Sequence, residues 1–233
     1  MNSFFNWSGG KDSALALYHV LNSSDYQVIE LLTTISLENQ RISMHGVRLD
    51  LLKEQASSLN LPLKSINLPQ SAGVDEYNRL MEKTLAEYQN NKIDHAIFGD
   101  IFLEDLRRFR EENLAKLNIK AVFPLWKKDT KSLIREFIDF GFKAITVAVD
   151  AKLLDRRFAG RIIDEDFLTD LPANVDPCGE NGEFHSFVFD GPIFTKSVPF
   201  KIGEIVERSY SSGDGNWHNS FYFCDLLPAT EPP

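Results

Sequence analysis

The first two-thirds of the chain alternates short apolar runs with segments whose apolar residues recur at helical spacing. The apolar runs predict strands at 3–7, 28–35, 63–68, 95–98, 120–123 and 142–149. The segments between them predict helices at 14–21, 47–59, 77–88, 103–117 and 130–140. This alternation predicts an α/β fold, with a parallel, twisted sheet and helices on both of its faces.

Four residues with distinctive chemistry lie at or just past the ends of predicted strands. They are Gly9, Gly10, Asp100 and Asp150. Ligands of parallel sheets bind outside the carboxyl ends of the strands. We therefore expect these four residues to share one rim of the sheet.

The alternation ends near residue 150, and the composition changes after it. Residues 172–183 are rich in Pro, Gly, Asn and Asp, and β-like runs follow at 184–190, 198–210 and 221–226. This pattern predicts a smaller C-terminal α+β subdomain beside the sheet. We expect a sheet domain over residues 1–150, a substrate subdomain over 151–227 and a tail over 228–233.

Composition and charge narrow the classes of protein. Of the 233 residues, 43% are hydrophobic and 25% charged, which is typical of a globular chain. No apolar run approaches the ~20 residues that span a bilayer, and the first residues lack a secretion signal. The 34 acidic and 25 basic residues give a net charge of -9, which argues against a broad nucleic-acid surface. Two cysteines without a CxxC pattern fit a reducing cytoplasm.

The stretch Ser8-Gly9-Gly10-Lys11-Asp12-Ser13 connects the first predicted strand to the first predicted helix. Two glycines permit a tight turn and leave room for a close ligand. The N terminus of the following helix offers free N–H groups and a positive dipole, which together cradle phosphate. Ser8 and Ser13 add hydroxyl groups, Lys11 adds a cation, and Asp12 is suited to hold Mg²⁺.

This loop differs from the Walker A loop. Walker A has a glycine separated by four residues from its Gly-Lys pair, and Ser or Thr directly after the pair. Here Phe5 and Asp12 occupy those positions, so P-loop transfer of a γ-phosphoryl group is disfavoured. A plain glycine turn with a helix cap is common in α/β folds, but six specific residues at this junction favour a nucleotide site.

The loop resembles the SGGxDS signature of the PP-loop ATP pyrophosphatases, which cleave ATP between the α and β phosphates. Further motifs along roughly residues 3–200 resemble, in order, those of the diphthine–ammonia ligase family. They are Ser43-Met44-His45, Phe98-Gly99-Asp100-Ile101, Pro124-Leu125-Trp126, Gly179-Glu180-Asn181-Gly182-Glu183-Phe184-His185 and Phe189-Asp190-Gly191-Pro192-Ile193-Phe194. The resemblance implies a Rossmann-like sheet of the adenine nucleotide alpha-hydrolase type.

The resemblance also implies a cytoplasmic amide ligase that uses ATP and Mg²⁺. Such an enzyme adenylates a carboxylate of a small molecule or protein, releases pyrophosphate, and lets ammonia displace AMP. Adenylation gives a poor electrophile a good leaving group, and the loop with its Mg²⁺ stabilises the departing pyrophosphate. The ammonia is free or comes from a glutaminase partner. The sequence leaves open whether the protein forms a homodimer.

The matching motifs carry the candidate site residues. The catalytic candidates are Lys11, Asp12, Asp100, Glu180 and Glu183. The nucleotide-binding candidates are Ser8, Gly9, Gly10, Lys11, Asp12, Ser13 and His45, with Asp12 as metal ligand. The substrate-binding candidates are Gly179, Glu180, Asn181, Gly182, Glu183 and His185.

Several of these residues have a structural alternative. Asp100 either caps the following helix or contacts metal or substrate, and His45 either contacts a ligand or lies in a surface loop. Turn chemistry explains the glycines of 179–183 but not both glutamates, which favours handling of ammonia, its proton or magnesium. Arg107 and Arg110 either pair with nearby glutamates or contact an anion. Trp126 lines a pocket or is core.

The C-terminal signature departs from the family pattern at one position. Diphthamide-making members are expected to read Glu-Gly-Gly-Glu-Phe/Tyr-Glu, whereas this chain ends the stretch with His185. Loss of an acidic side chain weakens recognition of the quaternary ammonium group of diphthine. The ATP chemistry is unaffected by this exchange, but the carboxylate substrate stays open.

Two other functions stay open from the sequence. One is sulfur transfer. Sulfur-transferring relatives use a cysteine pair or an iron–sulfur cluster. In this chain Cys178 lies beside the signature, while Cys224 belongs to the far C-terminal segment. The other alternative is a regulator that binds ATP without turning it over.

Overall fold

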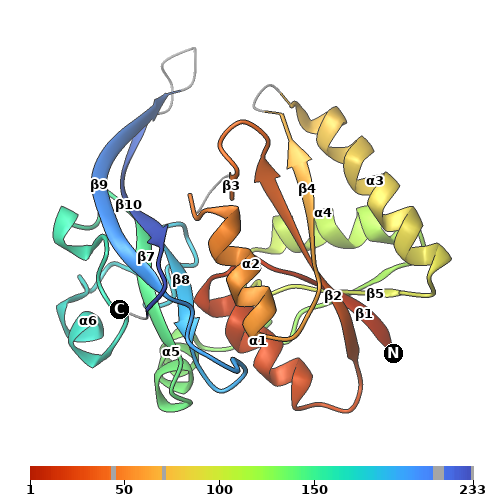
Figure 1. The fold of residues 1–233 in the computed structure, drawn as a ribbon, viewed down its shortest axis with the longest axis horizontal. Helices are drawn as coiled ribbons and strands as arrows, with labels where there is room; N and C mark the ends of the chain where they lie inside the picture. The colour runs from red at the N-terminus through yellow and green to blue at the C-terminus, as the bar shows by residue number, and fades with distance from the viewer. Residues whose placement is uncertain (43–45, 70–71, 212–217, 232–233) are drawn as a thin grey trace.

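A computed structural model describes residues 1–42, 46–69, 72–211 and 218–231, which form two β-sheets with helices between and outside them (Figure 1). Sheet A has the strand order β3-β2-β1-β5-β6, with β4 also paired to β2. Its strands are β1 (Asn2–Asn6), β2 (Gln27–Ser36), β3 (Arg41–Ile42), β4 (Leu63–Leu68), β5 (His95–Ile97) and β6 (Lys120–Val122). All of these pairs are parallel except β2 with the short β3, which confirms the predicted fold class.

Helices cover both faces of sheet A, as the apolar strands require. Helices α1 (Lys11–Leu21) and α2 (Leu49–Ser58) lie between the two sheets, and α3 (Val74–Asn90) and α4 (Glu104–Ala115) cover the outer face (Figure 1). The first pair packs into the core shared with the second sheet, and the second pair into a smaller core around Phe4 and Tyr88. In the described part of the chain, we find no helix with the length and apolarity to cross a membrane.

Sheet B is antiparallel, with the strand order β8-β7-β10-β9. Its strands are β7 (Lys143–Asp150), β8 (Phe184–Asp190), β9 (Phe200–Ser211) and β10 (His218–Pro228). Three helical segments accompany it: α5 (Thr130–Asp139), the 3₁₀ turn η1 (Arg156–Phe158) and α6 (Glu165–Asp170). In Figure 1 the long β9–β10 hairpin, drawn in blue, curves up beside β3.

The strand expected at 142–149 forms, but it does not complete the parallel sheet. β7 pairs antiparallel with β8 and β10, so it belongs to sheet B. Its central residues are buried on both faces, and a strand covered on both faces has the same apolar sequence in either type of sheet. Asp150 therefore ends a strand of sheet B and not of sheet A. At that strand end its Oδ1 accepts the backbone N–H of Lys152.

A carboxylate between two guanidinium groups fastens the hairpin to the N-terminal part. Arg48 Nη2 donates to Asp225 Oδ2 over 2.6 Å, and Arg41 Nη1 donates to Asp225 Oδ1 over 2.8 Å. Burial by itself raises the pKa of Asp225, but the bonds from Arg48 and Arg41 outweigh it and hold the pKa at about 2. The carboxylate is thus charged throughout the neutral range and ties β10 to β3 and to the start of α2.

We expect Asp225→Asn to lower the free energy of unfolding near neutral pH by about 1 kcal/mol, because the site is partly exposed and screened. The folded pKa lies below the unfolded value of about 3.9, so this stabilisation is present above about pH 4 and disappears as the pH falls toward 2. Urea unfolding at a series of pH values measures the difference from the parent protein. Asp105→Asn, which removes an exposed ion pair of α4, is the control. A deficit that stays constant down to acidic pH would contradict this explanation.

Candidate functional site

The phosphate-loop candidate lies where β1 ends and α1 begins. Gly9 has φ +76°, a left-handed conformation that glycine adopts without strain. The hydroxyl oxygens of Ser8 and Ser13 are 2.7 Å apart, and the N–H of Gly10 donates to Ser8 Oγ. Lys11 opens the helix, so the free N–H groups of its first turn lie beside the two hydroxyl groups. The local geometry is that of an anion cradle.

Gln55 of α2 holds this loop from behind and is fully buried. Its Nε2 donates to the carbonyl oxygens of Gly9 (3.0 Å) and Val188 (2.6 Å), and its Oε1 accepts the indole N–H of Trp7 (2.9 Å). The N–H of Val188 in β8 also donates to the Gly9 carbonyl, over 2.9 Å. Helix α2 and sheet B thus fix the loop together. No sequence motif marks Gln55. Its only distinguishing feature in the sequence is that a polar residue stands among the apolar positions of this predicted helix.

Lys11 and Asp12 form an ion pair at the start of α1. Lys11 Nζ donates to both carboxylate oxygens of Asp12, over 2.6 and 2.8 Å, and only 3% of the lysine is exposed. Burial raises the pKa of Asp12 despite the neighbouring lysine. Burial would lower the pKa of Lys11, but the charge of Asp12 carries it above its ordinary value. The backbone N–H of Lys11 donates to Ser186 Oγ of β8, a second bond from sheet B to this turn.

A cavity of about 600 Å³ lies in front of the loop and collects candidates from separate parts of the chain. Those that line it are Ser8, Gly10, Lys11, Asp12, Ser13, Asp100, Gly179, Glu180, Asn181, Gly182 and His185. Its lining also includes Arg110, for which the sequence left an anion contact open, and four residues that no sequence motif marked: Thr33, Thr34, Tyr77 and Met81. His45 lies outside the described residues.

Gly99 and Asp100, at the end of β5, contact different partners. A Cβ on Gly99 would lie 3.0 Å from backbone atoms of Asp12 and Ser13, so glycine allows β5 to approach α1. Asp100 Oδ1 accepts a bond from Arg110 Nη2 of α4, over 3.2 Å. Burial raises the pKa of Asp100, although Arg110 opposes the shift. Helix α4 begins without a side-chain cap, so Asp100 pairs with a cation of that helix instead of capping it.

The two glutamates of the C-terminal signature are placed differently. Glu180 lines the cavity, and its Oε1 accepts the backbone N–H of Ile101 over 2.9 Å. Burial raises the pKa of Glu180 to about 7. Glu183 is 3% exposed and turns into its own loop, where it accepts the backbone N–H groups of Asp176 (3.1 Å) and Asn181 (2.9 Å). Glu180 is thus placed to exchange a proton, while Glu183 shapes the loop that presents it.

His185 and Cys178 also line the cavity. Burial, assisted by the charge of Lys11, lowers the pKa of His185 to about 4, so its imidazole is neutral at physiological pH. Cys178 is buried, its Sγ donates to the carbonyl of Thr130, and burial raises the pKa of its thiol well above the ordinary range. Cys224 is buried in sheet B beside Gly160. Neither thiol has the environment of a reactive cysteine.

The carboxylates near the loop fit a metal that is shared with phosphate groups. Within the described residues, we find no cluster of three or more His, Cys, Asp or Glu side chains placed to hold a metal ion. Mg²⁺ in nucleotide sites needs only one or two carboxylates, because phosphate and water complete its octahedron. Asp12 meets this requirement, since its side chain is 28% exposed and lines the cavity.

Comparison with known proteins gives consistent matches along the chain. A family model described as diphthamide synthase N-terminal domain matches residues 1–121, and one described as diphthamide synthase C-terminal domain matches residues 129–230. Similar curated proteins include the diphthine–ammonia ligases of Schizosaccharomyces pombe (29% identity), Homo sapiens (28%) and Danio rerio (27%). Each match covers 87% of this chain, and 36%, 84% and 87% of the respective relative. The chain therefore spans about a third of the yeast relative's length.

We expect Gly99→Ala to weaken binding of ATP by about tenfold or more, because the added methyl group displaces the first turn of α1, where the phosphate cradle lies. Isothermal titration with ATP and Mg²⁺ measures the change. Gly73→Ala is the matched control, since a Cβ there meets no atom within 4 Å. Equal ATP affinities of the two variants would show that β5 does not support the loop.

Proposed function

Because the chain belongs to the diphthamide synthase family, we propose that it is an ATP-dependent ligase that joins ammonia to a carboxylate. The observation that carries this proposal is the single cavity lined both by the loop at Ser8–Ser13 and by the signature at Gly179–His185. The first stretch suits the phosphates of ATP. The second offers the carboxyl group of Glu180, whose pKa of about 7 lies near physiological pH, and the neutral imidazole of His185. The relatives' name, diphthine–ammonia ligase, describes the same reaction type.

In the first half-reaction the phosphate loop binds the leaving end of ATP. The N–H groups of the first turn of α1 and the hydroxyls of Ser8 and Ser13 donate to the β and γ phosphates, and Lys11 balances their charge. Asp12 would hold Mg²⁺, which would supply further stabilisation of the charge on the departing pyrophosphate. A substrate carboxylate oxygen attacks the α phosphorus, and the bond from that phosphorus to the bridging oxygen of the β phosphate breaks. The products are an acyl-adenylate and pyrophosphate.

In the second half-reaction ammonia attacks the acyl carbon, the bond to the adenylate oxygen breaks, and AMP leaves with the electron pair. The attacking nitrogen loses a proton, and Glu180 accepts it. A carboxylate with its pKa near 7 is well matched to this step, because it takes up a proton at neutral pH and releases it afterwards. The bond from the Ile101 N–H holds Glu180 Oε1 in place.

The substrate carboxylate differs from diphthine in this proposal. Diphthine carries a quaternary ammonium group, and the family's acidic residue is replaced by His185, which is neutral in the folded protein. We propose a cytoplasmic enzyme supplied with free ammonia or by a glutaminase partner. Sulfur transfer is disfavoured, because the Cys178 thiol is buried and its pKa is raised.

We expect purified protein with ATP, Mg²⁺, ammonium and a metabolite extract to form AMP, pyrophosphate and an amide, detected by chromatography and mass spectrometry. Asp12→Asn should lower this turnover about 100-fold or more, because the loop loses its metal ligand. Asp50→Asn on the exposed side of α2 is the control. ADP and orthophosphate as the only products would contradict the proposed reaction, as would ATP binding without any turnover.

We expect the kcat/KM of the parent enzyme, calculated on the concentration of unprotonated NH₃ at each pH, to rise through about pH 7 as Glu180 ionises. Glu180→Gln should be about 100-fold slower and lack that rise. Stability gives an independent check. Burial raises the folded pKa above the unfolded value of about 4.3, so the stabilisation is full below that value and is lost as the pH rises through 7. The melting temperature of Glu180→Gln, relative to that of the parent protein, should therefore rise as the pH goes from mildly acidic to mildly alkaline. Parallel melting curves and an unchanged pH–rate profile would assign the ionisation to another group.

A further inference from the structure

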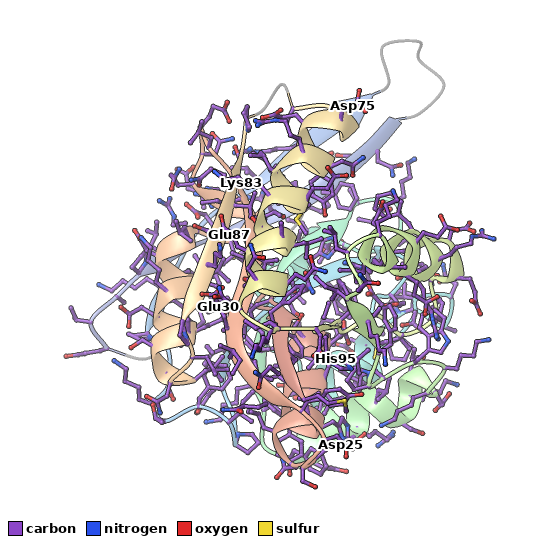
Figure 2. The ribbon with its side chains drawn as sticks, turned by 90° about the vertical axis from the view of Figure 1, so that its right-hand side faces the viewer. Asp25, Glu30, Asp75, Lys83, Glu87 and His95 are labelled. Carbon is purple, nitrogen blue, oxygen red and sulfur yellow. The ribbon has the colours of Figure 1, made fainter. Side chains whose placement is uncertain are left out.

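A second cavity, of about 420 Å³, lies on the outer face of sheet A between α3 and α4. Figure 2 faces this side of the molecule, with α3 upright and α4 beside it. Apolar side chains form much of its wall, among them Phe4 of β1, Leu85 of α3 and Leu114 of α4, with Phe98 just after β5 and Leu117 just after α4. Protein interiors are close packed, so a hollow of this size within an apolar core has the dimensions of a ligand pocket.

This α3–α4 pocket adjoins the cavity of the phosphate loop. Five residues line both hollows: Asn6, Tyr77, Met81, Phe98 and Arg110. The two hollows therefore border on each other, and a molecule that reaches both places its reacting end at the phosphate loop and its remaining part between α3 and α4. The reacting end meets polar groups and the rest meets apolar ones.

Arg110 lies at the junction of the two cavities and is paired with Asp100. Its guanidinium is 4.3 Å from the centre of the Phe98 ring, its Nε is 3.0 Å from Asp100 Oδ2, and its Nη2 donates to Asp100 Oδ1 over 3.2 Å. The side chain of Arg110 is 27% exposed and lines both cavities. Its outer N–H groups are therefore placed to meet the carboxylate of a molecule bound at the junction.

The charged side chains around the α3–α4 pocket favour one sign of charge in its ligand. Four cationic side chains and one carboxylate line it: Arg79, Lys83, Arg110, Lys116 and Glu82. Arg79 is neutralised by Glu76, and Arg110 by Asp100, so the two lysines outweigh the single Glu82. The charged groups that line the pocket therefore leave a small positive excess, which favours a neutral hydrocarbon body that ends in a carboxylate over a cationic one.

We propose that the acid activated by this enzyme is an apolar carboxylic acid, aryl or branched alkyl, whose hydrocarbon body occupies the α3–α4 pocket and whose carboxylate passes Arg110 toward the phosphate loop. This inference rests on the proposed ligase function and adds the class of its substrate. Burial of the hydrocarbon body supplies binding energy away from the reacting carboxylate. This class of substrate differs from diphthine, the cationic substrate that the names of the relatives give.

The first test compares two acids of similar length on the full chain saturated with Mg²⁺ and an ATP analogue that cannot be cleaved between the α and β phosphates. One acid is phenylbutanoate, and the other is trimethylammoniobutanoate, which carries a quaternary ammonium in place of the ring. Ligand-observed NMR titration measures both affinities. Phenylbutanoate should bind about tenfold more tightly or better, the gain expected from burying one aromatic ring. Equal affinities, or no binding of phenylbutanoate, would overturn the proposal.

The second test fills the pocket. Asn113 of α4 lines it and is half-buried, whereas its neighbour Glu112 is exposed. Asn113→Trp should weaken phenylbutanoate binding about tenfold and leave the affinity for the ATP analogue unchanged, while Glu112→Trp changes neither. If circular dichroism shows that Asn113→Trp does not fold, Asn78→Trp fills the pocket from α3.

The two ways of failing are distinguishable. Phenylbutanoate that binds Asn113→Trp as tightly as the parent protein would place the acid elsewhere and overturn the pocket, even if AMP and pyrophosphate are formed. Conversely, acid binding that Asn113→Trp abolishes, without AMP formation from any acid, would uphold the pocket as an acid site and remove the ligase function.

Discussion

The buried amide of Gln55 is the constraint on which the arrangement of the site depends. It joins the carbonyl of the phosphate loop to the backbone of β8 and to the indole of β1's neighbour Trp7, with every bond satisfied. A buried donor or acceptor left unpaired costs about 1–3 kcal/mol, so Gln55 couples the placement of the loop to that of α2 and β8. The loop at Ser8–Ser13 and strand β8 are therefore joined through one side chain, although Gly9 and Val188 lie more than a hundred positions apart.

Burial then divides the charged groups of the cavity into two kinds. Lys11 with Asp12, and Asp100 with Arg110, are pairs whose charges balance within the protein. Glu180 has backbone N–H partners but, among the described residues, no ion-pair partner, and desolvation raises its pKa to about 7. Desolvation also makes His185 neutral at physiological pH. One cavity thus holds paired charges beside the loop and, in Glu180, a carboxylate with a pKa near neutral, an arrangement suited to acid–base work.

In the proposed function, the parts of the site that bind ATP and those that select the acid follow different constraints. The phosphate loop needs its glycines, its hydroxyls and the start of α1, whatever acid is activated. The proposed acid side is formed by side chains outside the loop, such as His185 and the lining between α3 and α4. On this proposal, the ATP chemistry and the class of substrate are set by separate groups of residues.

The sequence by itself determined the alternation of strands and helices, the phosphate loop at Ser8–Ser13 and the signature at Gly179–His185, because strand period, helix period and glycine turns are local properties of the chain. It also brought the family resemblance that the comparisons support. Only the tertiary structure decided that β7 joins sheet B, that Glu180 faces the cavity while Glu183 turns inward, and that Gln55 holds the loop. A local pattern shows which residues are covered but not what covers them, and pairing, burial and pKa depend on that partner.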